Sequence, residues 1–164
     1  MQKPVCYDLA EVIAFLKEGN FSFFDFGSEG EEAYAKIDTK EAGVLRIYNV
    51  SDNVIPSKTV RQVLDVLEHL YACIRKAHGC LIHLNSDENK QIAWYLKWFP
   101  QEMDKIYDGL WRIQFGKIRW GHDPNPVTDG FLMTFIWDGY DPCAYSVKFV
   151  YEDMRPIAIE EWVI

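Results

Sequence analysis

The sequence lacks any long apolar run, and it contains only four cysteines and four histidines. No segment approaches the roughly 18 consecutive apolar residues of a membrane-spanning helix. Asp8 and Glu11 interrupt the N-terminal stretch that a secretory signal would keep apolar. The cysteines form no CxxC pair and lack the dense spacing of a disulfide framework. We therefore expect a cytoplasmic protein with free thiols and no attachment to a membrane.

The motifs of the common enzyme classes are also missing. There is no P-loop, no dinucleotide-binding glycine pattern, no nucleophile elbow around a serine and no HExxH helix. The segment from Asp123 to Asn125 begins like a calcium loop, but the glycine required at the sixth position is absent. We predict no cofactor and no bound metal, and we favour a protein without catalytic activity while leaving an unfamiliar enzyme open.

Basic side chains are outnumbered, with 17 Lys and Arg against 25 Asp and Glu and a net charge of −8. This balance argues against binding to nucleic acid or to an anionic membrane, and it favours a basic protein as partner. The acidic surplus lies in the first and last thirds of the chain, and its densest run is GSEGEEAY at 27–34. A solvated turn is the ordinary explanation of such a run, and an acidic contact surface is the functional one.

A chain of 164 residues is long enough for one core, so we expect a single compact domain over residues 1–164. Asp8 and Glu11 have the spacing of a capping box, which predicts a helix that ends at Gly19 and Asn20. Apolar residues at intervals of three and four predict a second, longer helix from Ser57 to Gly79. A third helix is expected from Ser86 or Asp87 to Pro100, with one or two further turns after it.

Short segments rich in β-branched and aromatic residues predict the strands. In the first half of the chain they lie at 21–27, 33–38, 44–50 and 80–85, and in the last third at 111–120, 130–138, 144–152 and 157–164. The last four are separated by turn sequences and predict an antiparallel meander in which 130–138 is central, because both of its faces are apolar. The fold class is α+β, with a mostly antiparallel sheet packed by two or three helices. A parallel pair formed by 44–50 and 80–85 across the long helix would make the sheet mixed.

The stretch HLYACIRKAHGCLIH at 69–83 resembles a metal site because it holds three histidines and two cysteines. Helix and strand periodicity nevertheless direct these side chains to different sides. His69 falls on the wet face of the helix, and Cys73 and Cys80 are expected to be small buried residues. His78 is expected to stand at the C-terminal end of the helix, where its charge suits the dipole. We predict no metal ion at this stretch.

Two functional hypotheses follow from these patterns. The first is a non-catalytic acidic binding protein, such as an inhibitor or immunity protein that neutralises a basic, nuclease-type toxin. Its expected contact residues lie in GSEGEEAY and in the WDGYDPC turn, and they are Glu29, Glu31, Glu32, Asp138, Tyr140 and Asp141. The alternative is a small-molecule-binding protein or enzyme with an aromatic pocket on the sheet, whose polar groups would be His83, His122 and Asp123.

Overall fold

The computed structural model describes residues 5–30, 32–82, 93–95, 110–116, 130–137 and 143–163. These residues form three helices, which are α1 (Leu9–Glu18), α2 (Ser57–Glu68) and α3 (Leu70–Ile82). They also form β1 (Asp25–Glu29), β2 (Glu32–Thr39), β3 (Gly43–Tyr48), β4 (Ala93–Tyr95), β5 (Leu110–Phe115), β6 (Gly130–Trp137), β7 (Cys143–Val150) and β8 (Pro156–Val163). None of the described helices has the length and apolar character needed to cross a membrane.

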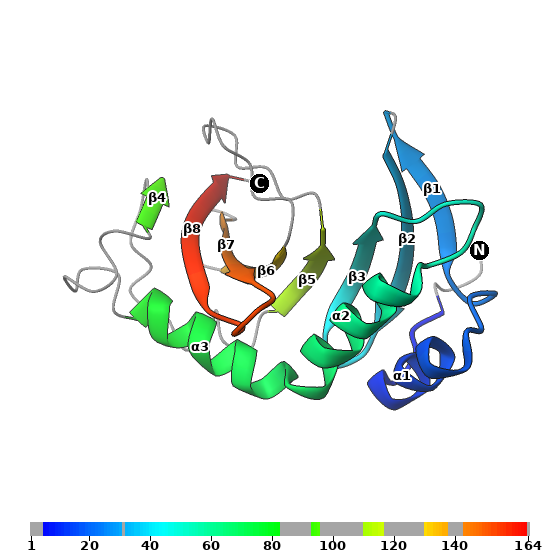
Figure 1. Ribbon diagram of the computed structural model, residues 1–164. Helices are drawn as coiled ribbons and strands as arrows, with labels where there is room; N and C mark the ends of the chain where they lie inside the picture. The colour runs from blue at the N-terminus through cyan, green and yellow to red at the C-terminus, as the bar shows by residue number, and fades with distance from the viewer. Residues whose placement is uncertain are drawn as a thin grey trace.

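The strands form one sheet in the order β1-β2-β3-β5-β6-β7-β8-β4. Figure 1 shows this sheet as a strongly curved layer with the three helices along one side of it. Neighbouring strands are antiparallel except for the β3–β5 and β4–β8 pairs. The α+β class is confirmed, as are the antiparallel meander of β5 to β8 and the central place of β6.

The mixed sheet is confirmed, but the predicted parallel partner of β3 is wrong. Cys80, Leu81 and Ile82 are the last residues of α3 rather than the start of a strand, and residues 83–85 lie outside the described residues. The parallel partner of β3 is β5, which is paired with it from Val44 and Arg112 onward. A short apolar run after a helix fits a buried helical turn as well as a strand, and periodicity does not separate the two.

The predicted helix from Ser57 to Gly79 is in fact two helices, α2 and α3, with a break at His69. The backbone of His69 leaves helical geometry at φ −113°, and its N–H donates to the carbonyl of Val66 at 3.1 Å. The bend allows the helices to follow the curved sheet (Figure 1). α2 packs against α1, and α3 packs against β8. Because the apolar spacing continues unchanged through the break, the sequence pattern did not indicate it.

Two further predictions need correction. The segment 21–27 was expected to be a strand, but Phe21 to Phe24 form a turn closed by a 3.1 Å bond from the Phe24 N–H to the Phe21 carbonyl, and β1 begins at Asp25. Within the helix expected up to Pro100, residues 93–95 form strand β4 instead. The other residues of that helix and the turns after it lie outside the described residues.

The start of α1 follows the capping pattern predicted from the sequence. Glu11 accepts the N–H of Asp8 at 3.2 Å in a capping box, and Gly19 ends the helix at φ 68°. Glu41 from the turn between β2 and β3 accepts the N–H of Leu9 at 2.6 Å. The Leu9 N–H is one of the donors that the first turn of a helix leaves unpaired, and Glu41 satisfies it. The bond thereby joins α1 to the turn between β2 and β3.

The core lies between the helices and one face of the sheet. Alternate residues of the strands face it, which places the intervening residues on the opposite face. The fully buried core side chains include Val12, Ala35, Leu45, Ile47, Val63, Val66, Ala77, Leu81, Ile113, Phe115, Phe131, Met133, Phe135, Tyr145, Val147 and Phe149. Gly43 lies at the junction of β3 with β5, where an added Cβ would overlap the carbonyl oxygen of Trp111. The close approach of these strands therefore depends on glycine.

Candidate functional site

The predicted acidic contact surface falls at the turn between β1 and β2. Glu29 ends β1, Glu32 begins β2, and the two are direct cross-strand neighbours. Gly30 makes the turn between them at φ 62°. The hairpin tip projects beyond the other strands in Figure 1. Glu31, Asp138, Tyr140 and Asp141 lie outside the described residues, so the structure places one part of the predicted surface.

Glu29 is not a simple solvated carboxylate. Its side chain is 69% exposed, yet its Oε2 lies 3.5 Å from Nη1 of Arg46 and accepts the hydroxyl of Tyr48 at 3.1 Å. The Arg46 guanidinium also lies 4.6 Å from the centre of the Tyr34 ring, as in a cation–π contact. Burial raises the pKa of the Tyr48 hydroxyl, and the Arg46 charge offsets part of that rise. The charge of Glu29 is therefore partly balanced inside the molecule.

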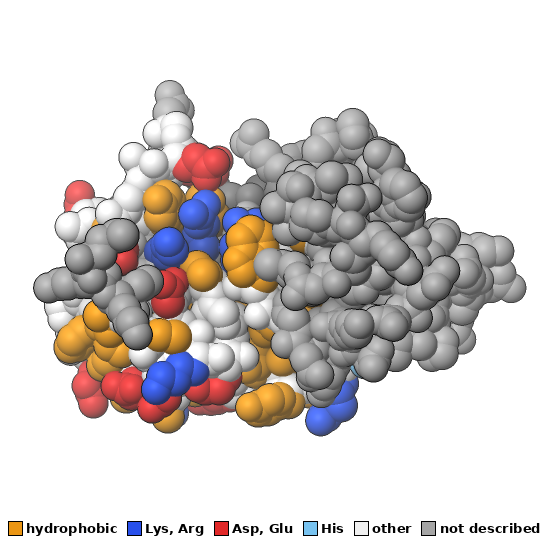
Figure 2. Space-filling view, turned by 180° about the vertical axis from the view of Figure 1, so that it is seen from behind, with side chains coloured by type: hydrophobic (Ala, Val, Ile, Leu, Met, Phe, Trp, Pro, Cys, Tyr) orange, Lys and Arg blue, Asp and Glu red, His pale blue; other side chains and the backbone are white. Residues whose placement is uncertain are grey.

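Arg46 belongs to a row of polar side chains on the sheet face that points away from the helices. We call this the polar sheet face and define it by its members, which are Lys36, Arg46, Arg112, Gln114, Thr134, Ser146 and Lys148. Strand register brings them together, because Lys36 is paired with Arg46, Arg46 with Gln114, Arg112 with Thr134, and Thr134 with Ser146. Figure 2, a view from behind, shows a group of Lys and Arg side chains with acidic and hydrophobic ones at its border.

Arg112 is the most unusual of these residues. Burial lowers the pKa of its guanidinium, and the neighbouring positive charge of Arg46 lowers it further. Among the described residues no carboxylate lies within ion-pair distance of Arg112. Its guanidinium lies 5.0 Å from the centre of the Trp111 ring, which is 40% exposed. Arg46 and Arg112 are thus two partly buried like charges on neighbouring strands.

Sequence reasoning missed both arginines as functional residues. A signal was present, since each stands between apolar residues in a strand, as in LRI at 45–47 and WRI at 111–113. A charge at such a position faces the side of the sheet opposite the core. The pattern did not show that β3 and β5 are neighbours, which is what brings the two charges together.

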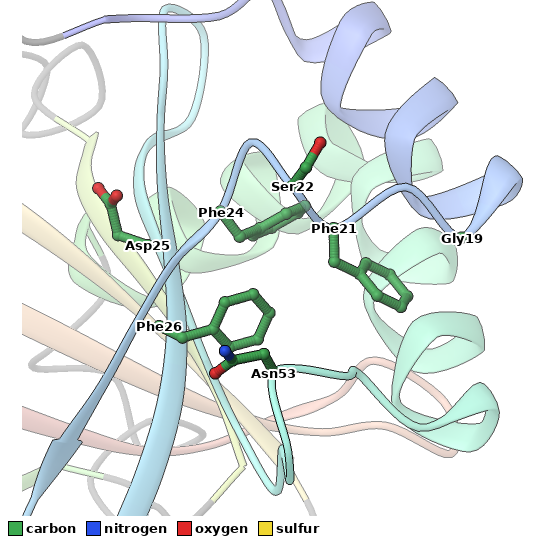
Figure 3. A pocket seen from close by; sticks show the side chains of 7 residues that line it. All are labelled: Gly19, Phe21, Ser22, Phe24, Asp25, Phe26 and Asn53. Atoms are coloured by element: carbon green, nitrogen blue, oxygen red, sulfur yellow. The ribbon is translucent and has the colours of Figure 1, made fainter.

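A cleft lies beside the start of β1, with a volume of about 630 Å³. It is lined by Gly19, Phe21, Ser22, Phe24, Asp25, Phe26 and Asn53. Figure 3 shows the rings of Phe21 and Phe26 and the amide of Asn53 around this space, with the Asp25 carboxylate directed away from the rings. A second cleft of about 260 Å³ adjoins it and shares Phe26 and Asn53. The two clefts combine aromatic rings with polar groups, which are the amide of Asn53, hydroxyl groups and the carboxylates of Asp25 and Asp52.

The cysteines and histidines of the 69–83 stretch are dispersed, and two of the predictions about them are confirmed. His69 is exposed, with Nδ1 2.8 Å from the Asp65 carbonyl, while Cys73 and Cys80 are buried. Burial raises the pKa of Cys73 to about 11 and also raises that of Cys80. The expected place of His78 is wrong, because α3 continues past it to Ile82. In the part of the chain that the structure describes, no three His, Cys, Asp or Glu side chains are grouped to hold a metal ion.

The three polar residues of the alternative pocket, His83, His122 and Asp123, lie outside the described residues. The aromatic cleft that the structure shows is formed instead by residues of 19–26 and by Asn53.

Comparison with known proteins gives no match to a family model, to a curated protein or to a solved structure.

Proposed function

We propose that this chain is a non-catalytic binding protein that captures a basic protein, in the manner of an inhibitor or immunity protein directed at a nuclease-type toxin. The observation that carries the proposal is the β1 edge of the sheet, where unpaired backbone, exposed carboxylates and an aromatic cleft lie together. The net charge of −8 supports it, because an acidic protein attracts a basic partner and speeds the encounter.

β1 is a terminal strand, so one side of its backbone pairs with β2, and none of the described strands lies along the other side. Such an edge can receive an extended segment of a partner by strand addition. Asp25, Ser28 and Glu29 are exposed along it. Carboxylates along an edge would oppose self-association and would favour a segment that carries lysine or arginine.

The carboxylates best suited to steer a cationic partner are those without internal cations. Asp25 and Asp52 are exposed, and within the described residues neither takes part in an ion pair. Asp52 and Asn53 border the two clefts beside β1. Glu29, by comparison, already interacts with Arg46. The aromatic rings of the cleft would then supply the contact area on which most binding energy depends.

A cytoplasmic site of action is part of this proposal. Cys6, Cys73 and Cys80 are free thiols, which supports a reducing compartment. A toxin that acts on nucleic acid in the same compartment would have to be neutralised there.

The experiment uses the product of the gene adjacent to the one that encodes this chain. Co-expression should restore the growth of cells that produce a toxic neighbour, and the purified proteins should associate more slowly at high salt than at low salt. Asp25→Lys and Asp52→Lys should slow association by about tenfold, since charges at the rim of an interface act mainly on the association rate.

Glu152→Lys is the matched control, because it makes the same charge change at the exposed turn between β7 and β8, five strands away from β1. It should leave association close to that of the wild type. Equal slowing by Asp25→Lys and Glu152→Lys would remove the β1 edge from the proposal and leave only a general effect of charge.

A second candidate function is the binding of a small aromatic or amide-containing ligand, and the cleft of Figure 3 favours it. Its volume of about 630 Å³ falls within the usual size of ligand pockets, and its surface is open to solvent and mainly polar, so a ligand that offers both a ring and hydrogen-bonding groups would suit it. A fragment screen followed by NMR would separate the two functions. Saturable shifts at Phe26 and Asn53 that the basic protein partner does not displace would favour the small ligand.

A further inference from the structure

The polar sheet face holds an arrangement that neither the acidic surface nor the aromatic cleft uses. Arg112 on β5 is opposite Thr134 on β6, and Thr134 is opposite Ser146 on β7. Arg46 on β3 lies on the same face, opposite Gln114 and two residue pairs further along the strands than Arg112. These four side chains come from four consecutive strands of the sheet, so their relative positions are set by backbone pairing.

Arg46 and Arg112 make fewer hydrogen bonds and ion pairs within the described residues than their burial requires. The Nε atoms of Arg46 and Arg112 are both buried, and neither has a hydrogen-bond partner among the residues that the structure describes. Arg46 lies 3.5 Å from Glu29 and interacts with the Tyr48 hydroxyl, whereas among the described residues no carboxylate lies within ion-pair distance of Arg112 and Glu29 acts on it only from further away. Two like charges that are sheltered from water repel each other and are costly unless an anion compensates them.

The hydroxyl groups of Thr134 and Ser146, beside Arg112, have one donor hydrogen that the bond between them does not use. Thr134 is 1% exposed and Ser146 is 0% exposed, and their oxygens lie 2.9 Å apart. Two hydroxyl groups carry two donor hydrogens, and their mutual bond uses one of them. The other hydroxyl can donate to a third group, and the neighbouring Arg112 is itself a donor. Hydrogen-bond donors of Arg112 and of the Thr134–Ser146 pair therefore lie next to each other, and one acceptor group placed between them could accept from both.

From this placement we propose that the polar sheet face binds a phosphate-type oxyanion between Arg46 and Arg112, with a hydroxyl of the Thr134–Ser146 pair as a further donor. Guanidinium groups present paired N–H donors that match the oxygens of phosphate, and such charged hydrogen bonds are among the stronger ones in proteins. Stacking of Arg46 on Tyr34 and of Arg112 on Trp111 holds both guanidinium groups in position. This inference does not depend on the proposed capture of a basic protein.

The test is an NMR titration of the nitrogen-15-labelled full chain with inorganic phosphate, which replaces chloride at constant ionic strength. The side-chain Nε–Hε resonances of Arg46 and Arg112 should shift in a saturable manner. Arg112→Gln and Thr134→Val should each weaken phosphate binding by about tenfold, because each removes a donor to a charged group. Arg61→Gln is the matched control on α2, where the arginine is exposed, and it should change the affinity by less than about twofold.

A shift that does not saturate, or an equal weakening by Arg61→Gln, would overturn the proposal. Malonate in place of phosphate distinguishes the chemical classes, since tighter binding of malonate would overturn the assignment to a phosphate-type group. Circular dichroism checks the fold of each variant. If Arg112→Gln fails to fold, the wild-type titration and Thr134→Val still decide the question.

Discussion

At the scale of single residues, burial changes the chemistry of Cys73 most clearly. Its side chain is fully buried on α3, and its Sγ lies 3.6 Å from the sulfur of Met154. Burial disfavours the thiolate, which raises the pKa of Cys73 from 9.0 to about 11. A thiol of this kind is neither a good nucleophile nor a metal ligand at neutral pH.

This shift predicts a loss of stability at alkaline pH. Because the folded state keeps the Cys73 proton up to a pKa of about 11 while the unfolded state releases it near 9, rising pH stabilises the unfolded state. The contribution of the protonated Cys73 thiol to the free energy of unfolding is fully present below pH 9 and should fall by about 2 kcal/mol on reaching about pH 10.5. Urea unfolding of the wild type and of Cys73→Ala at these two pH values measures it. A difference between the two proteins that stays constant with pH would contradict the prediction.

The candidate site could be predicted only in part at this scale. The run of glutamates was visible in the sequence, and Glu29 and Glu32 are adjacent as a hairpin requires. The interaction of Glu29 with Arg46 and Tyr48 was not visible, because those residues are 17 and 19 positions away from it in the chain. Charge composition reports which groups are present, whereas their pairing depends on strand register.

At the scale of elements, the ends of helices and strands follow local chemistry, while their breaks follow packing. α1 begins with a capping box and ends at a glycine, as its sequence predicts. The break between α2 and α3 at His69 has no glycine or proline beside it. The two helices pack against different partners, α1 and β8, which lie at different places along a curved sheet.

The β3–β5 pair depends on a single glycine, and this dependence can be measured. Gly43→Ala should destabilise the fold by about 3 kcal/mol, because φ is 66° and the new Cβ would overlap the Trp111 carbonyl oxygen. Gly30→Ala is the control, since Gly30 has a similar φ of 62° with no neighbouring atom within 4 Å. It should cost about 1 kcal/mol in urea unfolding. Equal losses for both variants would show that β3 and β5 do not approach closely.

At the scale of the whole molecule, two groups of antiparallel strands are joined through one parallel pair. β1 to β3 form one group, β5 to β8 form the other, and the chain between them passes through α2, α3 and the edge strand β4. A single cluster of buried residues nevertheless includes side chains from both groups and from all three helices. Shared burial of this kind makes the two groups stabilise each other.

We therefore expect the chain to unfold as one cooperative unit. Far-ultraviolet circular dichroism, which reports the helices and the sheet, and tryptophan fluorescence, which includes Trp111 on β5, should give the same urea midpoint. Gly43→Ala should lower both midpoints together. Two separate midpoints would mean that the groups on either side of the β3–β5 pair fold independently, against the expectation of a single domain.

Local sequence patterns were enough to predict the features that depend on near neighbours in the chain: the cap of α1, the meander of β5 to β8 and the α+β class. These arise from alternation, helical spacing and turn residues, which act over a few positions. Long-range packing, by contrast, places β3 beside β5, bends the helix at His69, and brings Arg46 and Arg112 together on one face. Contacts between distant segments depend on which surfaces bury each other best, and no local pattern records that choice.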